Sequence, residues 1–236
     1  MTGGTKPDRG RLDRDTVVAR ALALVDAEGL EALTIRRLAV DLGVTPMALY
    51  WHFRNKDELL DALVEHLLGT VTLPVLPAVP VLPAVPAVPA VHGRDWAEQL
   101  HAALTAFAAA LRPHPAIAPL IQARVLFSAP GLALAERALG LLREGGFTAE
   151  QAAQIGGYLV GAVVTLVVAE PGVSAEPDLE LRDSHTRARQ AALRSLSPSD
   201  YPNVIACAEP LTFCANGDAY FAQGIDLLVA GVRGVS

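Results

Sequence analysis

The strongest constraint on the fold lies in the stretch "PVLPAVPVLPAVPAVPA", where proline recurs at every third position from residue 74 to residue 89. Because proline lacks the backbone N–H group that a helix needs, no α-helix can run through this tract. A period of three residues matches the polyproline II conformation. We expect an extended linker, partly packed through its valines, that divides the chain into two helical parts. A docking segment for a proline-recognising partner is the alternative.

The residues before the tract carry the pattern of three short helices and a fourth, longer one. Apolar residues at helical spacing begin after Asp13, a suitable N-cap, and stop at Gly29. Thr34 can cap a second, shorter helix, which ends at Gly43. Asn55 can cap the fourth helix, with a glutamate three positions later in the arrangement of a capping box. We therefore predict a small helical domain here.

Helical periodicity resumes after the tract and continues to the end of the chain, without the alternating pattern of a strand. The fold class is therefore predicted to be all-α. The segment 197–215 looks irregular, and the helix over 148–170 is apolar nearly all round toward its end, which predicts burial on more than one side. The predicted helices cover 95–112, 120–127, 131–146, 148–170, 183–196 and 216–234.

Charge is distributed unevenly along the chain. The net charge is −6, which argues against a protein that coats nucleic acid along its whole surface. Residues 1–56 nevertheless hold nine basic and seven acidic side chains, whereas the rest of the chain is strongly acidic. This contrast predicts a compact anion-binding module at the N-terminal end.

Several other classes of protein find no support in the sequence. None of the motifs GxSxG, GxxxxGK[ST] and HExxH occurs, so an enzyme is not expected. Cys207 and Cys214 do not form a CxxC pair, and we expect both to be small buried residues in a reducing cytoplasm. The apolar run 155–169 is too short to span a bilayer, and the N-terminal residues lack the apolar segment of a signal peptide. We expect a cytoplasmic protein with no membrane partner.

The stretch "LTIRRLAVDLGVTPMALYWHF" has the layout of a helix-turn-helix motif. Leu38 and Ala39 give its first helix an inward face, and Gly43 can adopt the left-handed conformation of a tight turn. Leu49 and Phe53 lie four residues apart, so both can anchor the second helix to the core. The residues between these anchors are then expected on the sides and outer face of that helix.

Tyr50, Trp51 and His52 occupy that outer face in this interpretation. The basic residues beside them are Arg36, Arg37, Arg54 and Lys56. Exposed rings among cations are typical of a helix that enters a DNA groove. The alternative is that Tyr50 and Trp51 are ordinary core residues of a small helical bundle.

Residues 12–63 resemble the N-terminal domain of the TetR (tetracycline repressor) family of bacterial regulators, with "LGVTPMALYWHFRNKDELLDAL" similar to its signature. Weaker likeness continues through the turn "REGGF" and the final "FAQGIDLLVAGV". The resemblance implies a DNA-binding domain followed by a ligand-binding and dimerisation domain. The expected division is a flexible tail (1–11), a helix-turn-helix DNA-binding domain with its linking fourth helix (12–70), a proline-rich linker (71–94) and a ligand-binding and dimerisation domain (95–236).

The resemblance also implies roles in binding double-stranded operator DNA. Arg36 matches a residue that reads guanine, whose two major-groove acceptors suit a guanidinium. Thr34 is a cap that can also reach a phosphate. The tip of the recognition helix is less polar than in the tetracycline-binding members of the family, so a different operator is expected. The tip residues are Thr45, Pro46, Met47 and Ala48, and the backbone-contacting residues are Tyr50, Trp51, His52 and Lys56.

A homodimer is implied, with the helices over 148–170 and 216–234 paired with their copies. One short recognition helix makes too few contacts for useful specificity, and two-fold symmetry on a palindromic operator doubles them. Close helix approach at this interface would be allowed by Gly156, Gly157, Gly161 and Gly224. Alternatively, these glycines mark packing inside one subunit.

The resemblance implies a small-molecule effector without identifying it. Tetracycline-binding members hold a drug-chelated magnesium through a histidine and a glutamate. Glu170 matches the glutamate, but the position of the histidine is occupied by Ile121 or Gln122. Phe107 is retained among the drug-contacting positions, and His114 could line a pocket. We therefore expect a repressor with no metal and no cofactor, released from DNA by a small apolar or amphipathic molecule. A DNA-binding regulator or activator without small-molecule control is the alternative.

Overall fold

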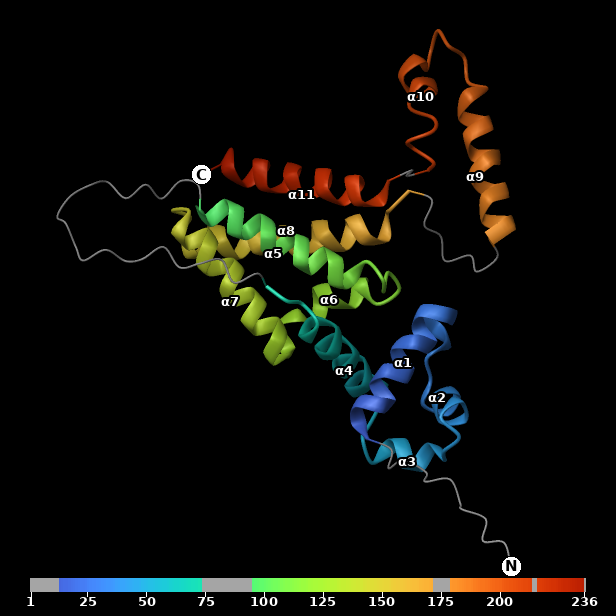
Figure 1. The fold of residues 1–236 in the computed structure, drawn as a ribbon, viewed down its shortest axis with the longest axis vertical. Helices are drawn as coiled ribbons and strands as arrows, with labels where there is room; N and C mark the ends of the chain where they lie inside the picture. The colour runs from blue at the N-terminus through green and yellow to red at the C-terminus, as the bar shows by residue number, and fades with distance from the viewer. Residues whose placement is uncertain (1–12, 74–94, 172–178, 214–215, 236) are drawn as a thin grey trace, which may run out of the picture. The chain divides into compact units, whose positions relative to one another are not determined.

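The computed structural model describes residues 13–73, 95–171, 179–213 and 216–235. Over these ranges the chain forms helices joined by turns and contains no strand, which confirms the all-α class. Contacts divide the chain into two compact units, 1–63 and 64–236 (Figure 1). The proline tract lies outside the described residues, so both interpretations of it remain predictions.

Unit 1 (residues 1–63) is built from short helices, and its last helix continues into unit 2 (residues 64–236). The elements are α1 (Arg14–Glu28), the 3-10 turn η1 (Leu30–Ala32), α2 (Ile35–Asp41), α3 (Pro46–Tyr50) and α4 (Lys56–Gly69). Leu38, Leu49 and Phe53 are buried together with the inner faces of α1 and α4. Each such side chain stabilises the fold by roughly 1.5–3 kcal/mol through the apolar surface that it removes from water.

Side-chain caps define where these helices begin. Asp13 and Thr34 accept hydrogen bonds from backbone N–H groups three residues later, as predicted, and Thr45 caps α3 in the same way. Asn55 Oδ1 accepts from the N–H of Glu58 at 2.9 Å. The rest of the predicted capping box differs, because the Glu58 carboxylate accepts from the N–H of residue 54 rather than from that of the cap itself.

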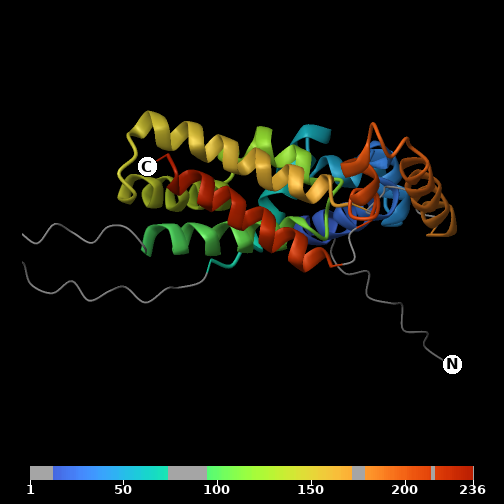
Figure 2. The same cartoon turned by 90° about the horizontal axis from the view of Figure 1, so that it is seen from above.

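Unit 2 is a larger helical body in which α8 has a central place. Its elements are α5 (Asp95–Leu111), α6 (Ala118–Arg124), the 3-10 turn η2 (Val125–Phe127), α7 (Ala129–Glu144), α8 (Ala149–Val168), α9 (Leu179–Arg194), α10 (Pro202–Ala206) and α11 (Gly217–Arg233). Helix α8 contacts α5, α6, α7 and α11, and α5 also packs along α11 (Figure 2). Helices α9 and α10 pack on each other.

Helix α8 packs against four helices, but its buried residues form one stripe, so the prediction of burial on more than one side is not met in the single chain. Leu159, Val163 and Val167 are buried, whereas Tyr158 and Val168 on another face are exposed. By length and composition α8 could also cross a membrane. Its contacts with four other helices place it in the body of unit 2, where 28% of its apolar stretch is buried.

Two expectations about the C-terminal part were wrong. The segment 197–215 was expected to be irregular, but it contains α10, which begins with Pro202 in its first turn. A helix of five residues is too short to show a periodic pattern, so the sequence could not reveal it. Cys207 is exposed rather than buried, because it follows the end of this short helix at the surface; Cys214 lies outside the described residues.

Candidate DNA-binding surface and ligand pocket

The turn between α2 and α3 has the geometry that the helix-turn-helix pattern predicts. Gly43 has a φ of 67°, in the left-handed region that favours glycine. The chain then reverses, and the N–H of Val44 donates to the carbonyl of Ala39 at 2.9 Å. Leu38 and Leu49, both fully buried, hold the two helices to the core on either side of this turn.

The exposure predicted for the aromatic residues after this turn is confirmed. Trp51 is 83% exposed and Tyr50 is 48% exposed, while Phe53 is buried, so the alternative of two ordinary core rings is wrong. Helix α3 ends at Tyr50, so Trp51 and the half-buried His52 lie at the turn that follows and not in the helix. Two large rings in water give unit 1 a surface suited to contact another molecule.

The two adjacent arginines of α2 differ in their partners. Arg37 forms an ion pair with Glu28 of α1 at 2.5 Å, whereas Arg36 is exposed and forms no ion pair with any described residue. Arg20 pairs with Asp41 across α1 and α2, and this hydrogen bond lowers the pKa of the Asp41 carboxyl. Arg36 is therefore the arginine of α2 whose guanidinium is available to a ligand.

The remaining predicted DNA-binding residues border this surface. Thr34 uses its hydroxyl oxygen to cap α2, and its O–H remains available as a donor. Thr45, Pro46 and Met47 are exposed, and Ala48 is half-buried. Lys56 is half-buried in the first turn of α4, where the helix dipole also favours an anion.

Val40 is a candidate that sequence reasoning missed. It is 78% exposed and lies one helical turn beyond Arg36, so both side chains occupy the same face of α2. The spacing of four residues from Arg36 was the available signal. An exposed valine on this face can make apolar contact with a thymine methyl group.

Unit 2 contains an apolar cavity of about 430 Å³ between α5, α6, α7 and α8. Phe107 of α5 and Gln122 of α6 both line it, as does Leu126 of η2. On α8 its lining runs from Ala153 to Val160. Its size falls within the range of cavities that hold small organic molecules.

The four residues predicted for a ligand site do not come together. Phe107 and Gln122 line the cavity, whereas Glu170 and His114 do not. Glu170 follows the end of α8 and lies ten residues beyond Val160, which corresponds to about 15 Å along a helix. His114 lies in the turn after α5, where its carbonyl accepts from the N–H of Ile117.

Glu170 instead belongs to a cluster that joins three helix ends. Arg112, just after α5, lies 3.3 Å from the Glu170 carboxylate and also pairs with Asp218 in the first turn of α11. Its guanidinium stacks on the ring of Phe221 at 4.8 Å. The hydrogen bond to Asp218 raises the pKa of Arg112. The Glu170 charge therefore has a protein partner.

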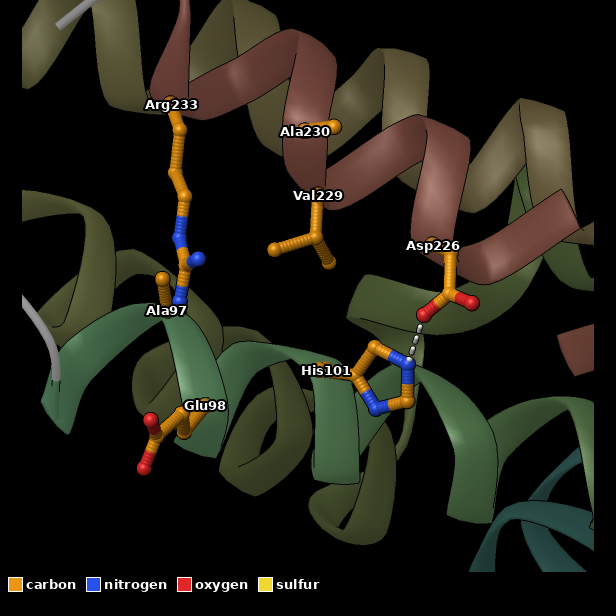
Figure 3. Close-up of a pocket in the computed structure, with 7 residues that line it drawn as sticks. All are labelled: Ala97, Glu98, His101, Asp226, Val229, Ala230 and Arg233. Atoms are coloured by element: carbon orange, nitrogen blue, oxygen red, sulfur yellow. Dashed lines mark hydrogen bonds and ion pairs between the residues drawn. The ribbon is translucent and has the colours of Figure 1, made fainter. Parts of the chain in front are cut away.

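A second, more open hollow of about 270 Å³ lies between α5 and α11 (Figure 3). His101 Nε2 lies 2.9 Å from Asp226 Oδ1 across it, and Glu98 and Arg233 also border it. Asp226 is exposed and His101 is half-buried, so this pair contributes at most about 1 kcal/mol to the association of the two helices.

Profiles of two known families match the chain. "Tetracyclin repressor-like, C-terminal domain" matches residues 88–235, and "Bacterial regulatory proteins, tetR family" matches residues 17–63. The chain belongs to the TetR family. The resemblance seen in the sequence is therefore confirmed over most of the chain, including the weaker C-terminal part.

Similar TetR-family proteins cover nearly the full length of the chain. The class A tetracycline repressor of Escherichia coli is 31% identical over 94% of this chain and 91% of its own length. ActR of Streptomyces coelicolor, solved with actinorhodin, is 29% identical with a TM-score of 0.69, over 96% of this chain and 99% of ActR. BioQ, solved with its double-stranded DNA operator, is 26% identical with a TM-score of 0.57, over 95% of this chain and 99% of BioQ.

The TetR family defines the general activity. Its members regulate transcription, bind operator DNA and small-molecule ligands, and act as dimers. The chain is therefore a transcriptional regulator and not an enzyme. The exposed surface of unit 1 lies in the region that matches the DNA-binding profile, and the cavity of unit 2 lies in the region that matches the C-terminal profile.

Proposed function

We propose that the chain is a repressor that binds a palindromic operator as a homodimer and is released by a small apolar or amphipathic molecule. The observation that carries this proposal is the apolar cavity of unit 2, in a chain whose unit 1 presents a free arginine and two exposed rings. The alternative, a DNA-binding regulator or activator without small-molecule control, leaves the cavity without a role.

On the DNA side, Arg36 reads a base and the recognition helix reads its neighbours. An unpaired guanidinium loses no protein contact when it turns toward guanine, and it can meet two acceptors at once. Pro46, Met47 and the half-buried Ala48 offer apolar contact, which suits thymine methyl groups. Tyr50, Trp51, His52 and Lys56 contact the phosphate backbone, and the hydroxyl of Thr34 can donate to a phosphate.

The dimer forms through α8 and α11. Tyr158 of α8 is 75% exposed and Leu227 of α11 is 67% exposed in the single chain, and Val168 is also exposed. Large apolar side chains on two adjacent helices are a surface that a second copy can cover. A dimer carries two copies of α3, which doubles the contacts available to a palindromic operator. The protein would act in the cytoplasm, where the operator lies.

The proposal can be tested by selecting bound sites from random DNA and then titrating compounds onto the complex. The selected site should be a palindrome, and fluorescence anisotropy of the labelled site should fall when an effector enters the cavity. A Leu139→Trp variant, which fills the cavity from α7, serves as the matched control: it should still bind DNA but no longer respond to the effector. If the effector released DNA equally from the unaltered protein and from the Leu139→Trp variant, the ligand would bind outside this cavity.

The departure from the tetracycline-binding members can be tested directly. Glu170 already pairs with Arg112, and no histidine lines the cavity among the described residues. Saturating tetracycline with magnesium should therefore leave the melting temperature unchanged. A large rise in the melting temperature would contradict the expectation of an effector without a metal.

A further inference from the structure

The chemical character of the unit 2 cavity limits what it can bind. Its described lining consists of aliphatic side chains, Phe107, small residues of α7 and α8, and a single polar side chain, Gln122. None of these lining residues is ionisable. A charged ligand would lose its hydration there without gaining a partner, which costs far more than burying an apolar group gains.

Gln122 is positioned to act on a ligand rather than on the protein. Gln122 is an exposed residue at the border of this apolar space, and its side chain makes no hydrogen bond to any described residue. The Nε2 atom lies 3.3 Å from where a Cβ on Gly161 would stand, so the lack of a side chain at Gly161 makes room for the amide against α8. A primary amide offers both donors and an acceptor to whatever fills the cavity.

Small residues form part of the cavity wall on α8, and Leu159 and Val160 form the rest. Ala153, Gly156 and Gly157 line the cavity with little or no side chain, so the ligand lies close to the helix backbone there. Backbone N–H groups inside a helix are already bonded, and such a wall therefore offers mainly van der Waals contact. Among the described lining residues, Gln122 is therefore the one whose side chain can form a hydrogen bond with the ligand.

We infer that the effector is an uncharged, mostly apolar molecule with a hydrogen-bonding carbonyl or hydroxyl group, and that Gln122 determines specificity by bonding that group. The inference deepens the proposed function and rests on it for the regulatory consequence. Gln122 selects between neutral molecules of the same shape, because an analogue without the polar group covers the exposed amide, removes it from water and leaves it unpaired. The apolar lining excludes anions.

A matched set of probes tests the inference: fluorene, 9-fluorenone and 9-fluorenone-4-carboxylate. The three share one ring system and differ by a carbonyl group and by a charge. Their affinities are measured by displacement of the neutral dye Nile red from the full-length protein. The carboxylate should bind at least about tenfold more weakly than fluorenone, because its charge has no partner in the cavity.

The role of Gln122 is tested with Gln122→Met, which keeps the length of the side chain but removes the amide. The ratio of fluorenone affinity to fluorene affinity should fall about two- to tenfold, the range for one neutral hydrogen bond. Because the ratio compares two ligands on the same variant, a general change in packing cancels. Gly161→Ala should lower the same ratio by displacing the amide. Gln154→Met, on α8 but outside the cavity lining, is the control and should leave it unchanged.

The role of Gln122 would be overturned by an unchanged affinity ratio in Gln122→Met, or by a fall of the same size in Gln154→Met. Failure of all three probes to displace the dye would also overturn it. A carboxylate that binds as well as fluorenone would overturn the selection of neutral molecules. Release of operator DNA is measured in parallel and separates the two proposals. A shifted ratio without DNA release would contradict the proposed function alone, and DNA release with an unshifted ratio would contradict the specificity of Gln122 alone.

Discussion

The two units of the molecule differ in the charged groups that they offer to a ligand. In unit 1, Arg36 stays unpaired on the surface, beside exposed rings. In unit 2, the prominent charges of Arg112 and Glu170 neutralise each other at the helix ends, and the cavity contains no ionisable lining residue within the described ranges. The difference teaches that a charged outer surface suits a hydrated polyanion, whereas an apolar cavity with one amide at its border suits a neutral molecule.

The largest expected effect comes from removing the anchor of the recognition helix. Leu49→Ala should destabilise unit 1 by about 2–5 kcal/mol, because a fully buried leucine is replaced by a cavity. Operator binding should be lost, while Nile red binding in unit 2 is retained; hydrogen exchange would locate the loosened helices. Equal loss of both activities would show that the two recognition sites cannot be separated in this way.

The next effect concerns the contrast between the paired and the unpaired arginine of α2. Arg36→Ala should cost about 1–3 kcal/mol of operator affinity and relax preference at one base position. Arg37→Ala is the matched control. It should lose less operator affinity, because the Arg37 side chain already pairs with Glu28. Anisotropy titrations against operators with single base changes provide the measurement. If Arg36→Ala weakened binding equally on every DNA sequence, Arg36 would not read a base.

A smaller effect is expected at the phosphate backbone. Lys56→Ala should weaken binding evenly across DNA sequences and reduce the slope of log K against log salt by about one unit. The reason is that one cation fewer releases one counterion fewer from the DNA. Titrations at several salt concentrations measure this slope. A change in base preference would contradict the assignment.

The smallest effect is a dependence of unit 1 stability on pH. The hydrogen bond from Arg20 lowers the pKa of Asp41 in the folded state. Its stabilising contribution is therefore present above the ordinary aspartate pKa, about 3.9, and is lost as pH falls through the lowered value. Urea unfolding of the protein and of Asp41→Asn should differ at neutral pH and converge in acid. If the difference in unfolding free energy between the two proteins did not change with pH, the Arg20–Asp41 pair would make no pH-dependent contribution to stability.

Local chemistry explains which parts of the fold could be predicted. Asp13, Thr34 and Gly43 act on backbone groups within a few residues of themselves, so their caps and turn are visible in the sequence. The exposure of Tyr50 followed from its place between two buried anchors. By contrast, α10 left no periodic signal, and nothing local distinguished the surface position of Cys207 from a buried one.

The sequence by itself determined the all-α fold, the helix-turn-helix and the family, because periodicity, caps and a near-continuous signature act over short distances. Only the tertiary structure decided the partners of the polar side chains. Arg37 meets Glu28 and leaves Arg36 free, Glu170 meets Arg112, and Gln122 comes to border a cavity. These contacts join residues from different helices, so their pairing depends on how the helices pack and not on any local pattern.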